Sequence, residues 1–402
     1  MFDITRFIST YVTGRDKSMF ASDIESNHEN LTNSIKDKTI LVIGGAGTIG
    51  SSFIRAILPF NPKSLVVVDI NENALTELTR DLRSTLKWTM PDDYVTYPMS
   101  FHDAVFEKMF RARKGFDIVA NFSAHKHVRS EKDLYSVEAL LENNVLRARH
   151  LLELLREFKP NHFFCVSTDK AANPVNIMGA SKKMMEDMIM AYSKEFNVTT
   201  ARFANVAFSN GSLPAGFMDR ISRNQPISAP RDVTRYFVSP DESGEICMLA
   251  CMLGKSGNIY FPKLGKEQVM TFSSMATLLL NNMGYKVVEC ASEHEALVKA
   301  EKLKNGSNEF PVLYSGSDTT GEKPYEEFYT SSESVDMTRY KALGVVTSVV
   351  PRPITEIDSL FKTLRNAFAS PDSKKSDIVD IMKGFLKNFD HQETGKNLDS
   401  KM

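Results

Sequence analysis

The chain has 402 residues, with 49 Lys and Arg against 50 Asp and Glu, and 42% of its residues are hydrophobic. This length exceeds the usual limit of about 250–300 residues for one hydrophobic core, so we expect a globular protein with two lobes. The net charge of −1 removes the electrostatic reason to expect a nucleic-acid binder. Apolar runs are only as long as strands, so we expect no membrane span.

The amino terminus lacks the basic and apolar regions of a secretory signal, which predicts a cytoplasmic location. Of the four cysteines, Cys247 and Cys251 lie four residues apart in an apolar run and share one face of a helix. They are interpreted as buried residues rather than ligands. His125 and His127 have no third ligand nearby in the sequence, so no metal site is predicted.

Residues 1–37 are expected to form a polar, partly helical arm. From Thr39, short apolar runs alternate with longer amphipathic segments, which predicts an α/β fold with a parallel sheet. The expected strands are Thr39–Ile43, Ser64–Asp69, Tyr94–Pro98, Ile118–Phe122, His162–Ser167 and Thr199–Phe203. The expected helices are Thr48–Leu58, Ala74–Leu86, Ala104–Arg113, Tyr135–Phe158 and Ala180–Glu195. Six strands with five crossovers predict a doubly wound Rossmann sheet over residues 38–204.

Beyond Asn205 this alternation loosens, and prolines fall among turns. We expect residues 205–340 to form a smaller, mixed α/β substrate-binding lobe over the carboxyl edge of the sheet. Residues 341–402 are expected to form a helical extension with a disordered end from about residue 391. Two amphipathic patterns support its helices, one at Ile357, Leu360, Phe361 and Leu364 and one at Ile378, Ile381, Met382 and Phe385.

A glycine-rich segment, Gly44-Gly-Ala-Gly47-Thr-Ile-Gly50, follows the first expected strand and precedes a helix. Glycine is needed where the backbone turns tightly and approaches a pyrophosphate, which the helix amino terminus then binds. The spacing is GxxGxxG rather than GxGxxG, and a simple strand-to-helix turn would show the same glycines. Asp69, at the end of the next strand, is placed to accept both hydroxyls of an adenosine ribose, which favours NAD over NADP; a surface aspartate is the alternative.

A second polar cluster, Thr168-Asp169-Lys170, ends the fifth expected strand and precedes Lys182. Carboxyl ends of parallel strands form the ligand crevice of a doubly wound sheet, so these groups should point into it. A hydroxyl, a carboxyl and an amine together suit acid–base chemistry on a sugar. Helix capping by Thr168 and Asp169, with a solvated Lys182, would explain the same residues.

Several motifs in this order resemble the nucleotide-sugar 4,6-dehydratases of bacterial polysaccharide biosynthesis, within the extended short-chain dehydrogenase/reductase superfamily. They are the glycine turn, Asp69-Ile-Asn-Glu72, Ser123-Ala-His-Lys-His-Val128, Asn143-Asn-Val145, Ser167-Thr-Asp-Lys-Ala-Ala-Asn-Pro174, Met178-Gly-Ala-Ser-Lys182, Arg202-Phe-Ala-Asn205, Thr234-Arg-Tyr-Phe237 and Gly321-Glu-Lys-Pro-Tyr-Glu-Glu327. The resemblance covers about residues 13–330.

The resemblance implies a lyase that uses NAD catalytically. A hydride leaves sugar carbon 4, water is lost across carbons 5 and 6, and the hydride returns to carbon 6. Thr168 would hydrogen-bond the oxygen on carbon 4, Asp169 would protonate the leaving hydroxyl, and Lys170 would take the proton from carbon 5. Lys182 matches the lysine that binds the nicotinamide ribose.

The resemblance also implies the remaining site residues and a homo-oligomer, with 135–158 and 180–195 as interface elements. Cofactor contacts are implied for Gly44, Gly47, Thr48, Ile49, Gly50, Asp69, Asn71, Ser123, Ala124, Asn144 and Lys182. Contacts to the nucleotide sugar, a UDP-N-acetylhexosamine, are implied for Lys126, Asn205, Ser212, Arg235 and Glu322. Because a diphosphate needs cations, Arg235 suits this role, although a surface salt bridge is its alternative.

Met178 stands where most short-chain dehydrogenases have tyrosine, four residues before the lysine. One branch of the dehydratases that the chain resembles also carries methionine there and retains the configuration at carbon 5. We therefore expect an active UDP-N-acetylglucosamine 4,6-dehydratase of that branch. An NAD-dependent nucleotide-sugar 4-epimerase and a catalytically silent NAD-binding scaffold are the alternatives.

Overall fold

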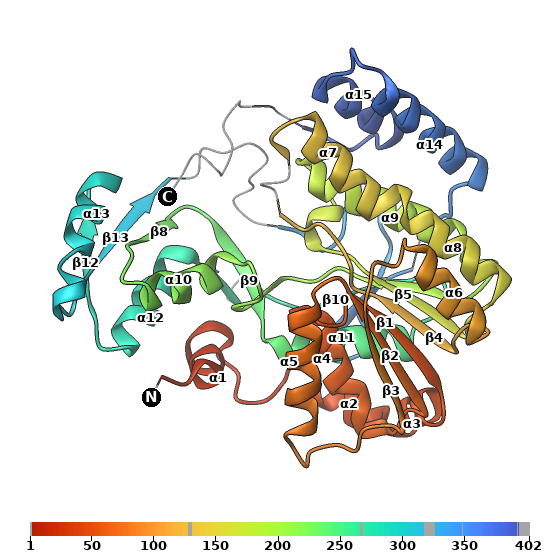
Figure 1. The fold of residues 1–402 in the computed structure, drawn as a ribbon, viewed down its shortest axis with the longest axis horizontal. Coiled ribbons are helices and arrows are strands. Elements are labelled where there is room, and N and C mark those ends of the chain that lie inside the picture. The colour runs from red at the N-terminus through yellow and green to blue at the C-terminus, as the bar shows by residue number, and fades with distance from the viewer. Residues whose placement is uncertain are drawn as a thin grey trace.

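The computed structural model describes residues 2–127, 131–265, 268–316, 326–347, 349–391 and 393. A nine-stranded sheet forms the centre of the larger part of the molecule (Figure 1). Its strands in spatial order are β14 (Val335–Asp336), β15 (Leu343–Val346), β10 (Ile259–Pro262), β6 (Val198–Ala201), β5 (His162–Val166), β4 (Ile118–Asn121), β1 (Thr39–Ile43), β2 (Ser64–Asp69) and β3 (Asp93–Pro98). The order β3-β2-β1-β4-β5-β6 is that of a Rossmann sheet, which confirms the predicted fold class.

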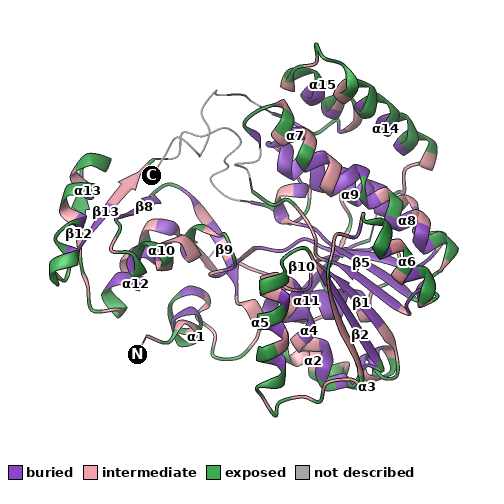
Figure 2. Cartoon of the chain, in the orientation of Figure 1, coloured by how far each residue is buried: buried purple, intermediate pink, exposed green. Residues whose placement is uncertain are grey.

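The strands from β3 to β10 pair in parallel, and β15 pairs antiparallel with β10. β1, β2 and β5 are runs of buried residues, shown in purple in Figure 2, because helices cover both faces of the sheet. The topological switch point lies between β1 and β4, where the strand order reverses. Ligands of such sheets bind at the carboxyl ends of the strands at this point.

Helices cover both faces of the sheet (Figure 1). One face carries α2 (Ala21–Ser26), α3 (His28–Ile35), α4 (Thr48–Ile57), α5 (Glu72–Arg83) and α11 (Pro240–Met252). The other carries α6 (Ala104–Ala112), α7 (Leu134–Leu141), α8 (Ala148–Glu157) and α9 (Ile177–Ala191). The predicted helix at 135–158 is interrupted by a π-helical segment, η4 (Glu142–Leu146).

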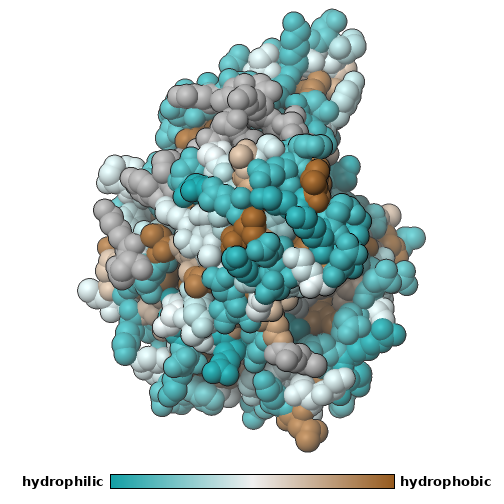
Figure 3. All heavy atoms as spheres, turned by 90° about the vertical axis from the view of Figure 1, so that its left-hand side faces the viewer, coloured by the Kyte–Doolittle hydropathy of each residue, from teal (hydrophilic) through white to brown (hydrophobic). Residues whose placement is uncertain are grey.

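A second hydrophobic core defines the smaller lobe, at the left of Figure 1. It contains two three-stranded sheets, β12-β13-β8 and β11-β9-β7. Their strands are β7 (Asn205–Val206), β8 (Ile227–Pro230), β9 (Thr234–Val238), β11 (Val269–Thr271), β12 (Lys286–Cys290) and β13 (Glu309–Ser315), and the helices are α10 (Leu213–Ser222), α12 (Phe272–Asn282) and α13 (Glu293–Ala300). Hydrophilic residues cover most of this end of the molecule, with hydrophobic ones scattered between them (Figure 3).

The sequence predicts one arm at residues 1–37 and one lobe at residues 205–340. In the structure each of these segments contributes side chains to both hydrophobic cores. Phe7 in α1 (Ile4–Phe7) and Ile8 in the following π-helix η1 (Ile8–Thr13) pack in the lobe, whereas Phe20, Leu31 and Ile35 pack in the larger core. Similarly, α11, β10 and β14 return to the larger core from within 205–340. Cys247 and Cys251 are buried in α11, as expected.

The carboxyl-terminal extension forms two helices, α14 (Ile354–Ala369), which packs on α9, and α15 (Lys375–Phe385), which packs on α14 (Figure 1). Together with the neighbouring helices and the sheet, α14 leaves almost every residue of α9 buried within the chain. Little of α9 is therefore left to contact a second copy of the chain, and its predicted role at an oligomer interface stays a prediction. The disordered end predicted near residue 391 lies outside the described residues, apart from 391 and 393. Among the described residues, no helix combines the length and apolar character needed to cross a bilayer.

Candidate active site

The glycine turn lies between the end of β1 and the start of α4, at the switch point. Gly44 has a φ of 72°, and a Cβ there would lie 2.7 Å from the Ser123 nitrogen. A Cβ at Gly50 would lie 2.3 Å from the Gly44 oxygen, so α4 packs directly on the turn. Gly47 is in looser surroundings, because its Cβ would have its nearest neighbour at 3.5 Å. This crowded turn leading into a helix amino terminus fits a dinucleotide pyrophosphate.

Asp69 ends β2 beside this turn. Its carboxylate accepts hydrogen bonds from the Ala46 nitrogen at 3.0 Å and the Asn71 nitrogen at 2.9 Å, which hold it at the carboxyl edge of the sheet. Asn71 caps α5 by accepting a hydrogen bond from Ala74 N, so its side-chain oxygen has a structural role. The Thr48 hydroxyl accepts a hydrogen bond from the Asn210 nitrogen at 3.0 Å. Next to Thr48, Ile49 packs against the larger core.

The segment that follows β4 lies on the other side of the expected crevice and forms its second wall. Ser123 and Ala124 begin this segment, which leads to α7. Ser123 N donates to the Asn121 side chain at 2.9 Å. Asn144, buried in η4, donates to the His125 oxygen at 2.9 Å and to the Ser181 hydroxyl at 3.1 Å, and it accepts from the His125 nitrogen. Asn144 therefore fixes this wall against α9. π-Helical turns of this kind are frequent at functional sites.

The second predicted cluster lies at the carboxyl end of β5, in the 3₁₀ turn η5 (Asp169–Ala171). Oδ1 of the buried Asp169 accepts hydrogen bonds from the Thr168 hydroxyl at 2.7 Å, the Lys170 nitrogen at 2.9 Å and the Lys170 ammonium at 3.1 Å. Thr168 does cap this short turn, as the alternative interpretation held. Although Thr168 caps the turn, its hydroxyl and the Lys170 ammonium both still contact the Asp169 carboxylate, so capping does not exclude a chemical role for these groups.

Glu326 is a site residue that the sequence interpretation did not single out. Its buried carboxylate lies 3.9 Å from the Lys170 ammonium and 3.9 Å from the guanidinium of Arg235 in β9. Arg235 itself is buried, so it is not a surface salt bridge. Glu326 belongs to the motif Gly321–Glu327, for which the resemblance implies a substrate contact at Glu322. Glu322 lies outside the described residues.

Lys182 and Met178 lie on α9 beside this cluster. Lys182 is 4% exposed and donates from its ammonium to the Val166 oxygen at 2.7 Å, so it is not a solvated lysine. Burial lowers the pKa of Lys182. Met178 is buried, and its backbone nitrogen donates to the Glu131 carboxylate at 2.9 Å. Burial raises the pKa of Glu131 to about 7.

The other predicted substrate contacts lie along the smaller lobe. The Lys126 ammonium donates to the Asn210 oxygen at 2.8 Å, so the wall after β4 meets the segment that also contacts Thr48. Asn205 is half-buried in β7, which pairs with the strand of Arg235. Ser212 caps α10 by accepting a hydrogen bond from Ala215 N at 3.3 Å. Lys126 therefore belongs to the segment after β4, whereas Asn205 and Ser212 lie on elements of the smaller lobe.

A buried ion pair joins α9 to the segment that follows Glu326. Arg202 is fully buried and donates to Glu186 of α9 at 2.7 and 2.9 Å, and to Glu333 at 2.9 Å from each of two nitrogens. It also donates to the Phe328 oxygen, two residues beyond Glu326. Ser167, next to Thr168, donates to Glu186 at 2.6 Å. The same ion pair therefore holds Ser167, next to Thr168, and Phe328, two residues beyond Glu326.

Comparison with known proteins points to one family. The polysaccharide biosynthesis protein family matches residues 40–348. An uncharacterized membrane protein of Methanocaldococcus jannaschii, MJ1061, is 33% identical over 247 residues, which are 60% of this chain and 71% of that protein. The probable polysaccharide biosynthesis protein EpsC of Bacillus subtilis is 26% identical over 79% of this chain and 55% of its own length. The chain thus spans only about half of EpsC.

Some relatives have named activities, a dehydratase and epimerases among them. A UDP-N-acetylglucosamine 4,6-dehydratase (inverting) of Campylobacter jejuni is 24% identical over 75% of this chain and 84% of its own. A UDP-glucose 4-epimerase of Rickettsia bellii is 24% identical over 82% of this chain and 99% of its own.

Solved structures share the fold. Pen from Bacillus thuringiensis aligns with a TM-score of 0.62 at 23% identity, covering 79% of this chain and 89% of Pen. The dTDP-glucose 4,6-dehydratase DesIV from Streptomyces venezuelae, solved with NAD bound, aligns with a TM-score of 0.53 at 19% identity, covering 72% and 87%. The family match over most of the sequence confirms the resemblance read from its motifs: the chain belongs to the polysaccharide biosynthesis protein family, within the extended short-chain dehydrogenase/reductase superfamily.

Proposed function

We propose that the chain is an NAD-dependent nucleotide-sugar 4,6-dehydratase that acts on UDP-N-acetylglucosamine and serves the synthesis of a surface polysaccharide or glycan. The observation that carries this proposal is the contact between Thr168, Asp169 and Lys170 at the carboxyl end of β5. Elimination of water needs an acid for the leaving hydroxyl and a base for the carbon 5 proton, and this cluster offers both groups side by side.

NAD, when bound, accepts a hydride from carbon 4 and returns it to carbon 6. Gly44, Gly47 and Gly50 leave room for its pyrophosphate, and Asp69 accepts hydrogen bonds from its adenosine ribose. Lys182 would bind the nicotinamide ribose from its place beside the end of β5, where its ammonium donates to the Val166 oxygen. Asp69 would repel a 2′-phosphate, which supports NAD rather than NADP as the cofactor.

The sugar residue lies against the polar cluster. Thr168 hydrogen-bonds the oxygen on carbon 4, and Lys170 takes the proton from carbon 5. Asp169 takes the hydroxyl proton released at carbon 4, which Met178 cannot accept, and delivers it to the hydroxyl leaving carbon 6. The proton from carbon 5 returns to that carbon as the hydride reaches carbon 6, so the net change is the loss of one water.

The diphosphate lies toward the lobe. Arg235 and Lys126 are the cations, and Asn205 and Ser212 are further polar groups along the same side. In a crevice shielded from water, a charge-assisted hydrogen bond from a buried guanidinium is strong. The Glu326 carboxylate lies 3.9 Å from both Lys170 and Arg235 and offsets part of their positive charge.

The test is to incubate the protein with UDP-N-acetylglucosamine and NAD and to follow the mass of the sugar nucleotide. Loss of one water is the expected result, and Asp169→Asn should abolish it. Asp81→Asn, which alters a half-exposed carboxylate on α5, is the control and should keep full activity. Normal water loss by the Asp169→Asn variant would refute the role given to this carboxylate.

A 4-epimerase is the second candidate, because Rickettsia epimerases match over nearly their whole length. An epimerase returns the hydride to carbon 4 and needs no acid at carbon 6, so Asp169 and Lys170 favour the dehydratase. The same assay distinguishes the two, since an epimerase yields a new stereoisomer of unchanged mass. No product at all would support the silent scaffold.

A further inference from the structure

The carboxyl-terminal extension is integrated into the larger core. Buried side chains of both its helices belong to that core: Ile357, Leu360 and Leu364 of α14 and Ile378 and Met382 of α15. The extension is therefore part of the folded body, although it lies beyond the segment matched by the family.

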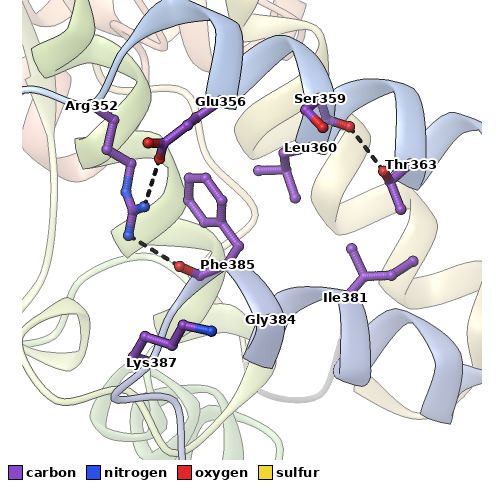
Figure 4. A pocket seen from close by; sticks show the side chains of 9 residues that line it. All are labelled: Arg352, Glu356, Ser359, Leu360, Thr363, Ile381, Gly384, Phe385 and Lys387. Carbon is purple, nitrogen blue, oxygen red and sulfur yellow. Dashed lines mark hydrogen bonds and ion pairs between the residues drawn. The ribbon is translucent and has the colours of Figure 1, made fainter.

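Arg352 anchors the extension at the point where α15 ends. Its guanidinium lies 2.9 Å from Asp187 of α9 and donates to the Phe385 oxygen at 3.0 Å. Figure 4 shows Arg352 beside Glu356 and the Phe385 oxygen, at one end of a cavity between α14 and α15. The chain that leaves α15 is thereby directed toward the start of α9.

Residues 386–391 then run alongside residues 171–176. Residues 171–176 connect η5, the turn that carries Asp169 and Lys170 and is called the catalytic turn below, to α9. The Asn388 amide donates to the Ala172 oxygen at 3.2 Å, and the Asp390 nitrogen donates to the Pro174 oxygen at 3.3 Å. The His391 Nδ1 lies 3.3 Å from the Val175 oxygen. Leu386 and Phe389 are buried beneath these contacts. Three carbonyl groups of one short connection therefore have their donors in the carboxyl-terminal segment.

This connection has little freedom at either end. It starts directly after Lys170 and ends at Asn176, whose side chain caps α9 by accepting from the Gly179 nitrogen at 2.7 Å. A Cβ at Gly179 would lie 2.6 Å from the Lys170 oxygen, so α9 packs against the catalytic turn itself. A shift of residues 172–175 must therefore move Asp169 and Lys170, or Met178 and Lys182.

We propose that Asn388 and His391 are positioning residues, which hold the connection 171–176 and thereby set the placement of Asp169 and Lys170 for the elimination step. The proposal rests on the function proposed above. Their contacts are made to backbone oxygens, so they act on the catalytic groups through the chain and not through the substrate. Displacement of a catalytic group by about 1 Å can slow a reaction about 100-fold, so modest disturbance is sufficient.

The test uses variants that keep shape and remove a donor, Asn388→Leu and His391→Phe. We expect kcat for water loss to fall about 10- to 100-fold, a much larger change than in the affinity for NAD, because the glycine turn and Asp69 lie outside this contact. His391→Asn, which restores a side-chain donor, should recover most of the rate. Reduced cofactor should accumulate during turnover, detected by its near-ultraviolet absorbance, since oxidation at carbon 4 would outpace elimination.

Asn197→Leu is the matched control, because the Asn197 amide also donates to a backbone oxygen, that of Asn161, near the start of β5. A second measurement needs no activity: amide hydrogen exchange over residues 170–178 should be faster in Asn388→Leu than in the control. Unchanged exchange, or a kcat equal to that of the control, would overturn the proposal. If the unaltered protein releases no water, the proposed function fails, and the exchange measurement still decides whether the segment holds the connection.

Discussion

Replacing Glu186 with glutamine tests the buried network that joins α9 to Arg202 and to Glu333. Glu186 is 1% exposed and pairs with the fully buried Arg202 at 2.7 Å. Loss of one partner from such a pair costs about 3–5 kcal/mol, because the remaining charge stays buried without full compensation. Glutamine keeps the shape and one acceptor, so we expect the free energy of unfolding to fall by about 3 kcal/mol at neutral pH.

The pKa of Glu186 determines how the free energy of unfolding should depend on pH. The pKa of Glu186 falls from 4.5 to about 2 in the folded protein: burial opposes this fall, and the Arg202 guanidinium outweighs it. Because the unfolded chain binds the proton more tightly, this group stabilises the fold fully above pH 4.5, and its contribution disappears as the pH falls through about 2. The sign is therefore that of a group that stabilises the fold while it is ionised, as expected for the partner of a buried guanidinium.

The assay is urea unfolding of the Glu186→Gln variant and the unaltered protein, followed by circular dichroism across the pH range. The gap in stability should be largest at neutral pH and should close as the pH falls below 4.5. Glu77→Gln is the control, because the Glu77–Arg80 pair is 72% exposed on both sides and should change stability by less than about 1 kcal/mol. A gap that is absent at neutral pH, or that does not change with pH, would refute the reasoning.

Three further changes test the crevice. Gly50→Ala should abolish NAD binding in calorimetric titration, because its Cβ would lie 2.3 Å from the Gly44 oxygen, whereas Gly216→Ala, with no atom within 4 Å, should bind NAD normally. Asp69→Asn should weaken NAD binding and reduce the preference for NAD over NADP. Competitive titration of the two cofactors measures this preference. An unchanged preference would contradict the contact between Asp69 and the adenosine ribose. Arg235→Gln should raise KM for the sugar nucleotide about 30-fold, since a hydrogen bond to a charged group contributes about 2 kcal/mol, and should leave NAD affinity unchanged.

The Rossmann half could be predicted from sequence because its signals are local. Buried parallel strands are continuous apolar runs, so the predicted ranges for β1 and β2 match the structure. Polar residues directly after a strand, such as Asp69 and Thr168, could be assigned to the carboxyl edge from the fold alone. α9 begins three residues earlier than expected, at Ile177, because Asn176 caps it.

The features of the site and the fold that could not be predicted depend on packing between residues far apart in the chain. Glu326 reaches Lys170 only because the chain returns from the lobe, and no local pattern distinguishes it from Glu322 or Glu327. The amphipathic pattern of the extension indicated helices, but not that α14 would help to bury α9. Likewise, the wide spacing between Arg202 and Glu333 gives no hint that the two residues form a pair.

The division of the first residues between two cores has a consequence for how the protein is made. The ring of Phe7 lies 5.9 Å from that of Phe208, Arg15 pairs with Glu242, and the Asp23 carboxylate accepts from the Lys341 and Ala342 nitrogens. During synthesis these residues leave the ribosome hundreds of residues before their partners exist. The amino-terminal segment must therefore dock after translation of most of the chain, so its attachment is a late step of folding.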